Sequence, residues 1–177
     1  MKNYGQNISK HRLFSGLTEA QIAELSALVK TKTYPENTSI FKENDIADNI
    51  YLIIDGKVSI AKNIENIDKN YQIATLNAGD VLGEMSLLQK TARAASAHAV
   101  TPTTLLVFSI KALHAFAQHK DWQMQLIYYK LVENISHELS TRINKTNQIV
   151  INLLHDDMLK KNVDVEKMSF FASLWRF

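Results

Sequence analysis

The segment that most constrains the fold of this chain runs from residue 49 to residue 61, because it predicts two β-strands joined by a tight turn. Residues 49–54 are rich in β-branched and aromatic side chains, and Asp55-Gly56, a dipeptide typical of hairpin turns, follows them directly. Residues 57–61 alternate polar and apolar side chains, as a strand does when one of its faces is buried. We therefore expect a β-hairpin in this part of the chain.

Three further segments have the composition of short strands, namely residues 71–76, 95–100 and 104–108. The polar stretch 63–70 predicts a hairpin loop, and residues 77–80 predict a turn because they contain Asn, Gly and Asp. Several short strands with turns between them are typical of a sandwich or a barrel, of which the jelly roll is one form. The region from residue 31 to 109 is therefore expected to be a β-domain.

Helical patterns flank this β region on both sides. Residues 1–30 are expected to be helical, because Thr18 and Gln21 have the spacing of a capping box and apolar side chains recur behind them. After the strands, Ser109 and Asp121 are expected to cap a short helix and a long helix within residues 110–160.

The long helix carries a wide apolar stripe. Its members repeat about every four positions or lie near the same face; they are Leu131, Ile135, Leu139 and Ile143, with Tyr128, Val132, Ile149 and Leu153 beside them. The stripe is compatible with packing on the helix's own domain and with pairing to a second copy, and we favour a homodimer. Residues 161–177 are expected to form an aromatic tail, either docking on a partner or a membrane surface or folding back on the dimer.

The composition excludes several kinds of site. The 177 residues contain no cysteine, which excludes disulfides, thiolate catalysis, iron–sulfur clusters and cysteine-ligated zinc. A net charge of +2 provides no strong attraction to nucleic acid or to a membrane. No stretch approaches the roughly 20 apolar residues of a membrane span. The opening residues lack the apolar core of a signal peptide, so we expect a cytoplasmic protein.

The sequence predicts neither an enzyme nor a metal centre. None of the six histidines is paired at a convincing metal-ligand spacing, since even His114 and His119 would lie on different faces of a helix. The strand-to-helix serine motif of the α/β-hydrolases is also missing from the sequence. We therefore predict no catalytic residues and no metal ligands.

The most informative stretch runs from residue 83 to residue 95. Gly83 permits a backbone geometry, or a close approach of a ligand, that a side chain would block. A short helical turn after it would leave its first N–H groups free to face an anion. Arg93 adds a permanent positive charge with planar donors that suit phosphate oxygens, and an ionised Glu84 suits a sugar hydroxyl. These parts fit a small anion carrying a ribose, but Glu84 and Arg93 also fit a surface ion pair, and the residues alone leave both interpretations open.

This stretch resembles the phosphate-binding cassette of the cyclic-nucleotide-binding domain family, which includes the bacterial catabolite activator protein and the regulatory subunit of protein kinase A. The family's cassette reads roughly Phe-Gly-Glu-Leu-Ala-Leu-Leu and then Pro-Arg-Ala-Ala; here the matching runs are Leu82-Gly83-Glu84-Met85-Ser86-Leu87-Leu88 and Ala92-Arg93-Ala94-Ala95. Residues 51–58, 13–17 and 77–80 are similar to the family's hairpin, its opening segment and the turn before its cassette. The resemblance covers about residues 12–147 and implies a mainly β fold, an eight-stranded β jelly-roll barrel with an N-terminal helix and a long C-terminal helix.

The resemblance also implies a role for each cassette residue. Gly83 and Glu84 would meet the ribose 2′-hydroxyl, Arg93 would pair with the phosphate, and Ala94 and Ala95 would offer backbone N–H groups and small side chains beside it. The set of expected ligand-binding positions is completed by Leu82, Met85 and Ser86. Because Ala94 stands where a threonine often favours cyclic GMP in the family, cyclic AMP is the expected ligand and cyclic GMP the second choice. The long helix would form a lid over the base, with the candidates Glu138, Leu139, Ser140 and Thr141.

Among the departures from the family's pattern, Leu82 and Met85 are apolar replacements, and none of the departures removes a group expected to contact the ligand; two others concern the backbone. Ala92 replaces the usual proline before the arginine, so the loop has one constraint fewer. Asn44 stands where the family often has glycine, and asparagine tolerates a positive φ angle.

We therefore predict a regulatory sensor that binds cyclic AMP and signals to a protein partner through movement of the long helix. The alternatives are a scaffold or dimerisation module of the same fold that binds no ligand, and a fragment of a cyclic-AMP-dependent transcription regulator. Direct DNA binding is not expected, because few residues follow the long helix and the helical region has no basic stripe.

Overall fold

The computed structural model describes residues 11–64, 67–89 and 91–160, so the aromatic tail at 161–177 lies outside the described residues. The chain divides into two compact units, the first ending at Ile135 and the second beginning at Ser136. Among the helices of the described residues, none combines the length and the apolar character that crossing a bilayer requires.

The first unit begins with a short 3₁₀ helix, η1 (Arg12–Phe14), and the helix α2 (Glu19–Ala27). The predicted capping box is confirmed: Gln21 N donates to Thr18 Oγ1 at 3.3 Å, and Thr18 N donates to Gln21 Oε1 at 3.0 Å. The Gln21 side chain also donates to the carbonyl oxygen of Gln123, 3.2 Å away in the first turn of the long helix. One residue therefore both caps α2 and ties it to the C-terminal helical region.

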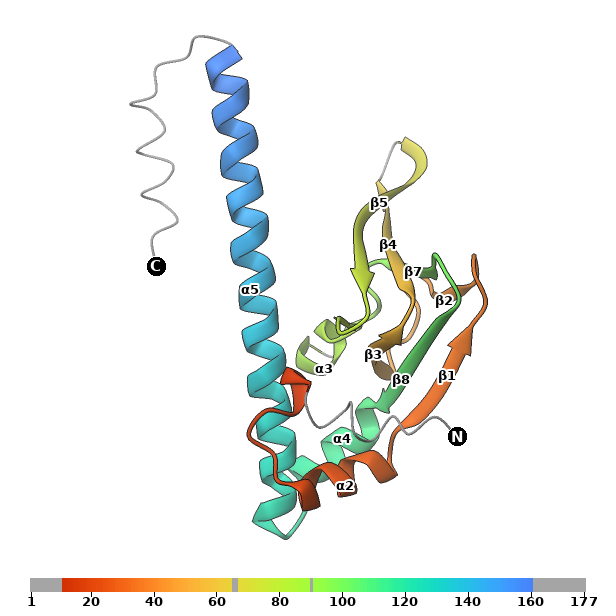
Figure 1. The fold of residues 1–177 in the computed structure, drawn as a ribbon, viewed down its shortest axis with the longest axis vertical. Coiled ribbons are helices and arrows are strands. Elements are labelled where there is room, and N and C mark those ends of the chain that lie inside the picture. The colour runs from red at the N-terminus through yellow and green to blue at the C-terminus, as the bar shows by residue number, and fades with distance from the viewer. Residues whose placement is uncertain (1–10, 65–66, 90, 161–177) are drawn as a thin grey trace. The chain divides into compact units, whose positions relative to one another are not determined.

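Eight strands follow, and the structure places them in two four-stranded antiparallel sheets (Figure 1). The strands are β1 (Lys30–Tyr34), β2 (Ser39–Phe41), β3 (Asn49–Asp55), β4 (Lys57–Ile64), β5 (Ile67–Asn77), β6 (Val81–Leu82), β7 (Ser96–Ala99) and β8 (Thr103–Ser109). One sheet has the order β1-β8-β3-β6 and the other the order β2-β7-β4-β5. This is the double-sheet jelly-roll order, in which strands from the start of the chain pair with strands from the end.

The expected barrel is therefore wrong in one respect, because the eight strands form two separate sheets rather than one closed ladder. Side chains of both sheets meet in a single core; its buried members are Tyr34, Tyr51, Ile53, Val58, Leu82, Ala97, Ala99 and Leu105. Burial of apolar surface between the two sheets therefore holds them together, whereas in a closed barrel continuous hydrogen bonding joins all the strands.

The predicted hairpin at residues 49–61 is only partly correct. Both strands exist and the chain turns at Gly56, whose φ angle is +94°. However, β3 pairs with β8 and β6, whereas β4 pairs with β5 and β7, so the two strands belong to different sheets. Asp55-Gly56 specifies a reversal of the chain, but it does not specify which strands become hydrogen-bonded.

The loop predicted at residues 63–70 is also wrong, because β4 and β5 run through most of it and pair as far as Ile64 with Ile67. These strands were not predicted because their composition is polar. Alternation of polar and apolar side chains appears only where one face of a strand is buried, whereas main-chain hydrogen bonding between strands does not require it. The short strands β1, β2 and β6 were likewise not located by the sequence patterns.

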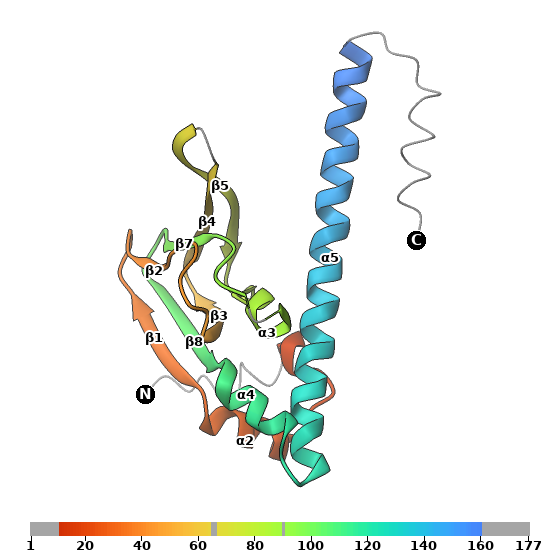
Figure 2. The same ribbon diagram turned by 180° about the vertical axis from the view of Figure 1, so that it is seen from behind.

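Two helices follow the strands, α4 (Ile110–Ala117) and α5 (Trp122–Lys160). Both predicted caps are confirmed: Ala112 N donates to Ser109 Oγ at 3.4 Å, and Gln123 N donates to Asp121 Oδ1 at 2.9 Å. In the views of Figures 1 and 2, α2, α4 and the first turns of α5 lie together at one end of the strands.

The first part of α5 is packed into the first unit. Ile127, Leu131 and Ile135 are buried, and Asn134 Nδ2 donates to the carbonyl oxygens of Leu13 and Ser15 at 2.9 and 3.0 Å. The apolar stripe predicted from the sequence therefore serves the core of the first unit as far as Ile135.

We predict that Ile53→Ala lowers the free energy of unfolding by about 2–5 kcal/mol, because the side chain is 1% exposed in the core between the sheets. Ile73→Ala makes the same chemical change in a strand at a side chain that is 58% exposed, and it should cost less than about 0.5 kcal/mol. Chemical denaturation of the two variants measures both values, and equal costs would contradict the assignment of the core.

Candidate functional site

The site is built on the segment that links β6 to the short helix α3 (Met85–Gln89). Gly83 has a φ angle of +78°, a conformation that side-chain-bearing residues adopt at a cost. The backbone N–H of Leu87 donates to the carbonyl oxygen of Glu84 at 3.0 Å and closes the helical turn that the sequence predicted. Glu84 and Ser86 are buried, whereas Met85 is exposed.

Arg93 reaches back to this turn from the segment before β7, and only 4% of it is exposed. Its Nη1 donates to the carbonyl oxygen of Gly83 at 3.3 Å, and its Nη2 donates to that of Asn49 in β3 at 2.6 Å. The buried Nε has no hydrogen-bond partner among the described residues. Since the two bonds end on neutral main-chain oxygens, they satisfy donors without neutralising the positive charge.

The backbone of Arg93 is held from the opposite direction by the loop between β2 and β3. Arg93 N donates to the carbonyl oxygen of Asp45 at 3.0 Å, and Asn44 N donates to the carbonyl oxygen of Arg93 at 2.9 Å. Asn44 adopts a φ angle of +68°, the conformation for which asparagine can replace glycine. Asparagine therefore fits the backbone conformation that this loop adopts at position 44.

Gly83 leaves no room for a side chain beside the guanidinium. A Cβ atom at this position would collide with Arg93 Nη1 and would lie 3.2 Å from the carbonyl oxygen of Asn49. The glycine is thus needed twice, for its φ angle and for the close approach of the arginine.

Two aromatic rings complete the surroundings of the guanidinium. The Cζ of Arg93 lies 4.2 Å from the ring centroid of Phe41 and 5.5 Å from that of Tyr51. The two rings are themselves stacked, with centroids 5.8 Å apart and an interplanar angle of 25°. Both distances to Arg93 lie within the range of cation–π attraction.

The electrostatics of the site follow from this burial. Desolvation lowers the pKa of Arg93, while Tyr51, Asp48 and Glu84 act in the opposite direction. Burial likewise raises the pKa of the Tyr51 hydroxyl. The guanidinium stays protonated at neutral pH, so the site holds a buried cation that a bound anion would stabilise.

The structure brings together Gly83, Glu84 and Arg93, as the sequence predicted for a ligand site, and Ala94 and Ala95 follow directly on the chain. Leu82 belongs to the buried core between the sheets, and its role in ligand binding stays a prediction. The sequence analysis did not assign a role in the site to Asn49, Phe41 or Tyr51. No local motif could reveal the first two, because strand packing alone brings them to Arg93.

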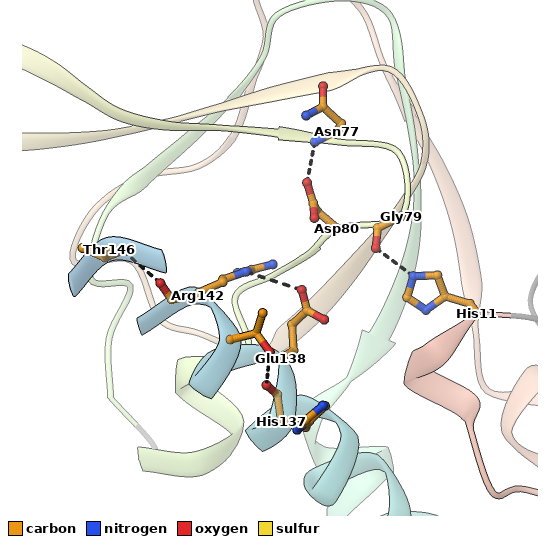
Figure 3. Close-up of polar contacts among 9 residues, drawn as sticks. His11, Asn77, Gly79, Asp80, His137, Glu138, Arg142 and Thr146 are labelled. Carbon is orange, nitrogen blue, oxygen red and sulfur yellow. Dashed lines mark hydrogen bonds and ion pairs between the residues drawn. The ribbon is translucent and has the colours of Figure 1, made fainter. Parts of the chain in front are cut away.

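The turn that precedes the cassette is fastened by two polar contacts, which Figure 3 shows. Asn77 N donates to Asp80 Oδ2 at 2.8 Å, and His11 Nε2 lies 2.7 Å from the carbonyl oxygen of Gly79. His11 Nδ1 accepts from Leu13 N at 3.1 Å, so Nε2 is the nitrogen that donates to Gly79. The segment before α2 is thereby attached to the strand connection that leads into β6.

The lid candidates Glu138, Leu139, Ser140 and Thr141 lie in the second unit, on α5. Within this helix, Thr141 Oγ1 donates to the carbonyl oxygen of His137 at 3.0 Å, and Arg142 Nε lies 3.7 Å from Glu138 Oε1 (Figure 3). Their role as a lid stays a prediction.

Across the described ranges, no group of three or more His, Cys, Asp or Glu side chains is arranged to hold a metal ion. His119 Nδ1 accepts from Asp121 N at 3.1 Å, and the ring of His114 packs edge-on against Tyr128 at 5.6 Å. The first contact is local, whereas the second joins α4 to α5, and the buried His114 Nε2 has no hydrogen-bond partner among the described residues.

Comparisons with known proteins agree with this geometry. Residues 31–120, about half of the chain, match the family described as Cyclic nucleotide-binding domain. The chain is 34% identical over 94 residues to the Cyclic AMP receptor protein of Thermus thermophilus, covering 53% of this chain and 43% of that protein. It is 22% identical over 151 residues to a CRP-like cAMP-activated global transcriptional regulator of Mycobacterium tuberculosis, covering 85% of this chain and 63% of that protein.

The fold is also shared with solved structures. The crystal structure of a cyclic nucleotide-binding domain from Methylobacillus flagellatus superposes with a TM-score of 0.72 and 24% identity, covering 85% of this chain and 82% of that chain. The chain spans less than two thirds of the length of the two curated relatives, which extend beyond the matched region.

We predict that Gly83→Ala and Gly79→Ala each cost about 1–2 kcal/mol of stability, because both glycines have positive φ angles. Only Gly83→Ala should displace the Arg93 guanidinium, since a Cβ at Gly79 would come no nearer than 3.9 Å to another group. Crystal structures of the two variants test this. An Arg93 side chain that keeps both carbonyl bonds in Gly83→Ala would contradict the steric argument.

Proposed function

The chain belongs to the cyclic nucleotide-binding domain family, and on this premise we propose that it binds 3′,5′-cyclic AMP at the turn around Gly83 and reports the binding to a partner. The observation that carries the proposal is the buried Arg93 guanidinium, whose bonds end on neutral carbonyl oxygens. Burying a charge is costly, and although Asp48 and Glu84 act on Arg93, its hydrogen bonds to carbonyl oxygens do not neutralise it; a phosphate diester would add negative oxygens matched to planar donors.

The neighbouring groups suit the rest of the nucleotide. Glu84 follows Gly83 directly and acts on the charge of Arg93, so a carboxylate that can accept from a ribose 2′-hydroxyl is close to the phosphate position. Ala94 and Ala95 come directly after the arginine and would present N–H groups there. Ala94 has no hydroxyl to offer a guanine amino group, which supports cyclic AMP over cyclic GMP.

We propose that signalling uses α5 and that this helix pairs with a second copy of the chain. In the second unit, the helix exposes apolar side chains at helical spacing; they are Ile143, Ile149, Val150 and Leu153. Such a row on a solvated helix favours pairing with a similar helix. Binding at the cassette can then alter the dimer if the two arrangements of the helix differ in ligand affinity.

The proposed protein is a regulator in the cytoplasm and not an enzyme. One relative is described as a transcriptional regulator, and the matched region covers only part of it. This chain could therefore be the sensing part of a longer regulator, which is the second candidate function. A scaffold that binds no ligand is the third, and the retention of both Glu84 and a buried Arg93, which is costly to bury, argues against it.

We predict that calorimetric titration shows binding of cyclic AMP, weaker binding of cyclic GMP and none of 5′-AMP. Arg93→Ala should weaken cyclic AMP binding by about 2–5 kcal/mol, which is more than tenfold in Kd. The matched control is Arg12→Ala, the same change at an exposed arginine of η1, which should leave the Kd unchanged.

Two results would contradict this proposal. If no heat of binding is detected and the melting temperature is unchanged at a high concentration of cyclic AMP, the scaffold function is favoured. Undiminished affinity in a folded Arg93→Ala variant would place the phosphate elsewhere.

We also predict that the double variant Ile143→Glu, Leu153→Glu converts a dimer into a monomer, because two carboxylates would be buried at the helix pair. The control is Gln148→Glu, which adds a carboxylate that should leave the dimer intact. At 3.6 residues per turn, position 148 lies on the far side of the helix from Ile143. Sedimentation velocity measures the association state, and a monomeric wild-type chain at tens of micromolar would overturn the pairing.

A further inference from the structure

We propose that Phe41 is a positioning residue for the cyclic-nucleotide site: its ring supports the Arg93 guanidinium from one face and directs its donors toward the ligand. The proposal rests on the function proposed above. Phe41 lies in β2, outside the cassette, and precedes Arg93 by 52 positions in the sequence (93 − 41 = 52).

Phe41 is brought to the site by strand pairing. It is the last residue of β2, which pairs with β7 through Ser39 with His98 and Phe41 with Ala97, and the register shifts between these two pairs. The half-buried ring packs against the core between the sheets, and it stacks on Tyr51 of β3 in the other sheet. The ring therefore has little freedom to move away from the guanidinium.

The guanidinium of Arg93 is contacted by the ring of Phe41 and by two carbonyl oxygens. The ring of Phe41 lies beside the guanidinium, with 4.2 Å between the Arg93 Cζ and the ring centroid. Both terminal nitrogens use their in-plane N–H groups for the carbonyl oxygens of Gly83 and Asn49. The ring contact and the two hydrogen bonds together restrict the guanidinium, and an anion would be met by the N–H groups that these two bonds leave over.

An aromatic face is suited to this task because it attracts the cation without consuming a donor. A carboxylate in place of Phe41 would hold the charge more strongly, but it would also accept the donors and neutralise the charge that the phosphate needs. A leucine would fill similar space without the attraction of the ring quadrupole. The aromatic ring thus orients the arginine and leaves its charge available.

The test is a double-mutant cycle with cyclic AMP as the probe. Phe41→Leu should weaken cyclic AMP binding at least tenfold in the wild-type background and less than threefold in the Arg93→Lys background. The ammonium of lysine is a compact charge on a flexible stem, so it has no plane for the ring to orient. Phe41→Tyr keeps the ring and should restore the affinity to within threefold of wild type.

Two controls separate positioning from general loss of packing. Phe108→Leu makes the same change at a buried ring that packs on Phe14 at 6.0 Å, and it should leave the Kd within threefold of wild type. Phe41→Met is the second non-aromatic variant if Phe41→Leu does not fold. Equal losses of affinity in both arginine backgrounds would overturn the proposal, because Phe41 would then act only on the fold.

A second measurement needs no nucleotide, so it tests the contact of Phe41 with Arg93 separately from the proposed function and remains usable if Arg93→Lys binds too weakly to titrate. In the ligand-free protein, the Nε–H resonance of Arg93 should be shifted by the ring current of Phe41 and should exchange slowly with water. The resonance is assigned by its loss in Arg93→Lys. Phe41→Leu should reduce the shift to the part that the Tyr51 ring contributes, 5.5 Å from the Arg93 Cζ, while Phe41→Tyr retains the full shift. An unchanged resonance in Phe41→Leu would overturn the positioning role.

Discussion

The guanidinium of Arg93 is buried, and its two terminal nitrogens donate to the carbonyl oxygens of Gly83 and Asn49. This interaction joins three separate parts of the chain: the turn before α3, the start of β3 and the segment before β7. Its acceptors are neutral, so the positive charge is held in place without being neutralised. The backbone of the site, including the left-handed conformation and the missing side chain at Gly83, accommodates this one cation.

The jelly-roll topology makes that arrangement possible. Phe41 belongs to the sheet that contains β7 and β4, whereas Tyr51 belongs to the sheet that contains β8 and β6. Their stacked rings are a contact between the two sheets, and Arg93 lies against both of them. The cation is therefore coupled to the packing of the core. A change in the position of Arg93 on ligand binding would alter its contacts with both sheets and with the loop at Asn44 and Asp45.

Sequence patterns located the elements that have a strong local cause. The capping box of Thr18 and Gln21, the helix caps at Ser109 and Asp121, and the turn at Gly56 each follow from a few adjacent residues, and all are present. Patterns failed where the cause is not local. The strands through residues 63–70 carry too little apolar alternation to be recognised. The turn at Asp55-Gly56 joins two sheets instead of forming a hairpin, because the pairing of strands depends on the whole chain.

The sequence by itself determined the chemistry of the candidate site: a glycine, a carboxylate and an arginine at the spacing of a known cassette, with a short helical turn between them. It also determined the family, since residues 31–120 suffice to match it. Only the tertiary structure decided how Arg93 is held, because Asn49 and Phe41 reach it through strands that are distant along the chain. The physical reason is that hydrogen-bond directions and ring contacts depend on packing between sheets, which no local pattern of side chains encodes.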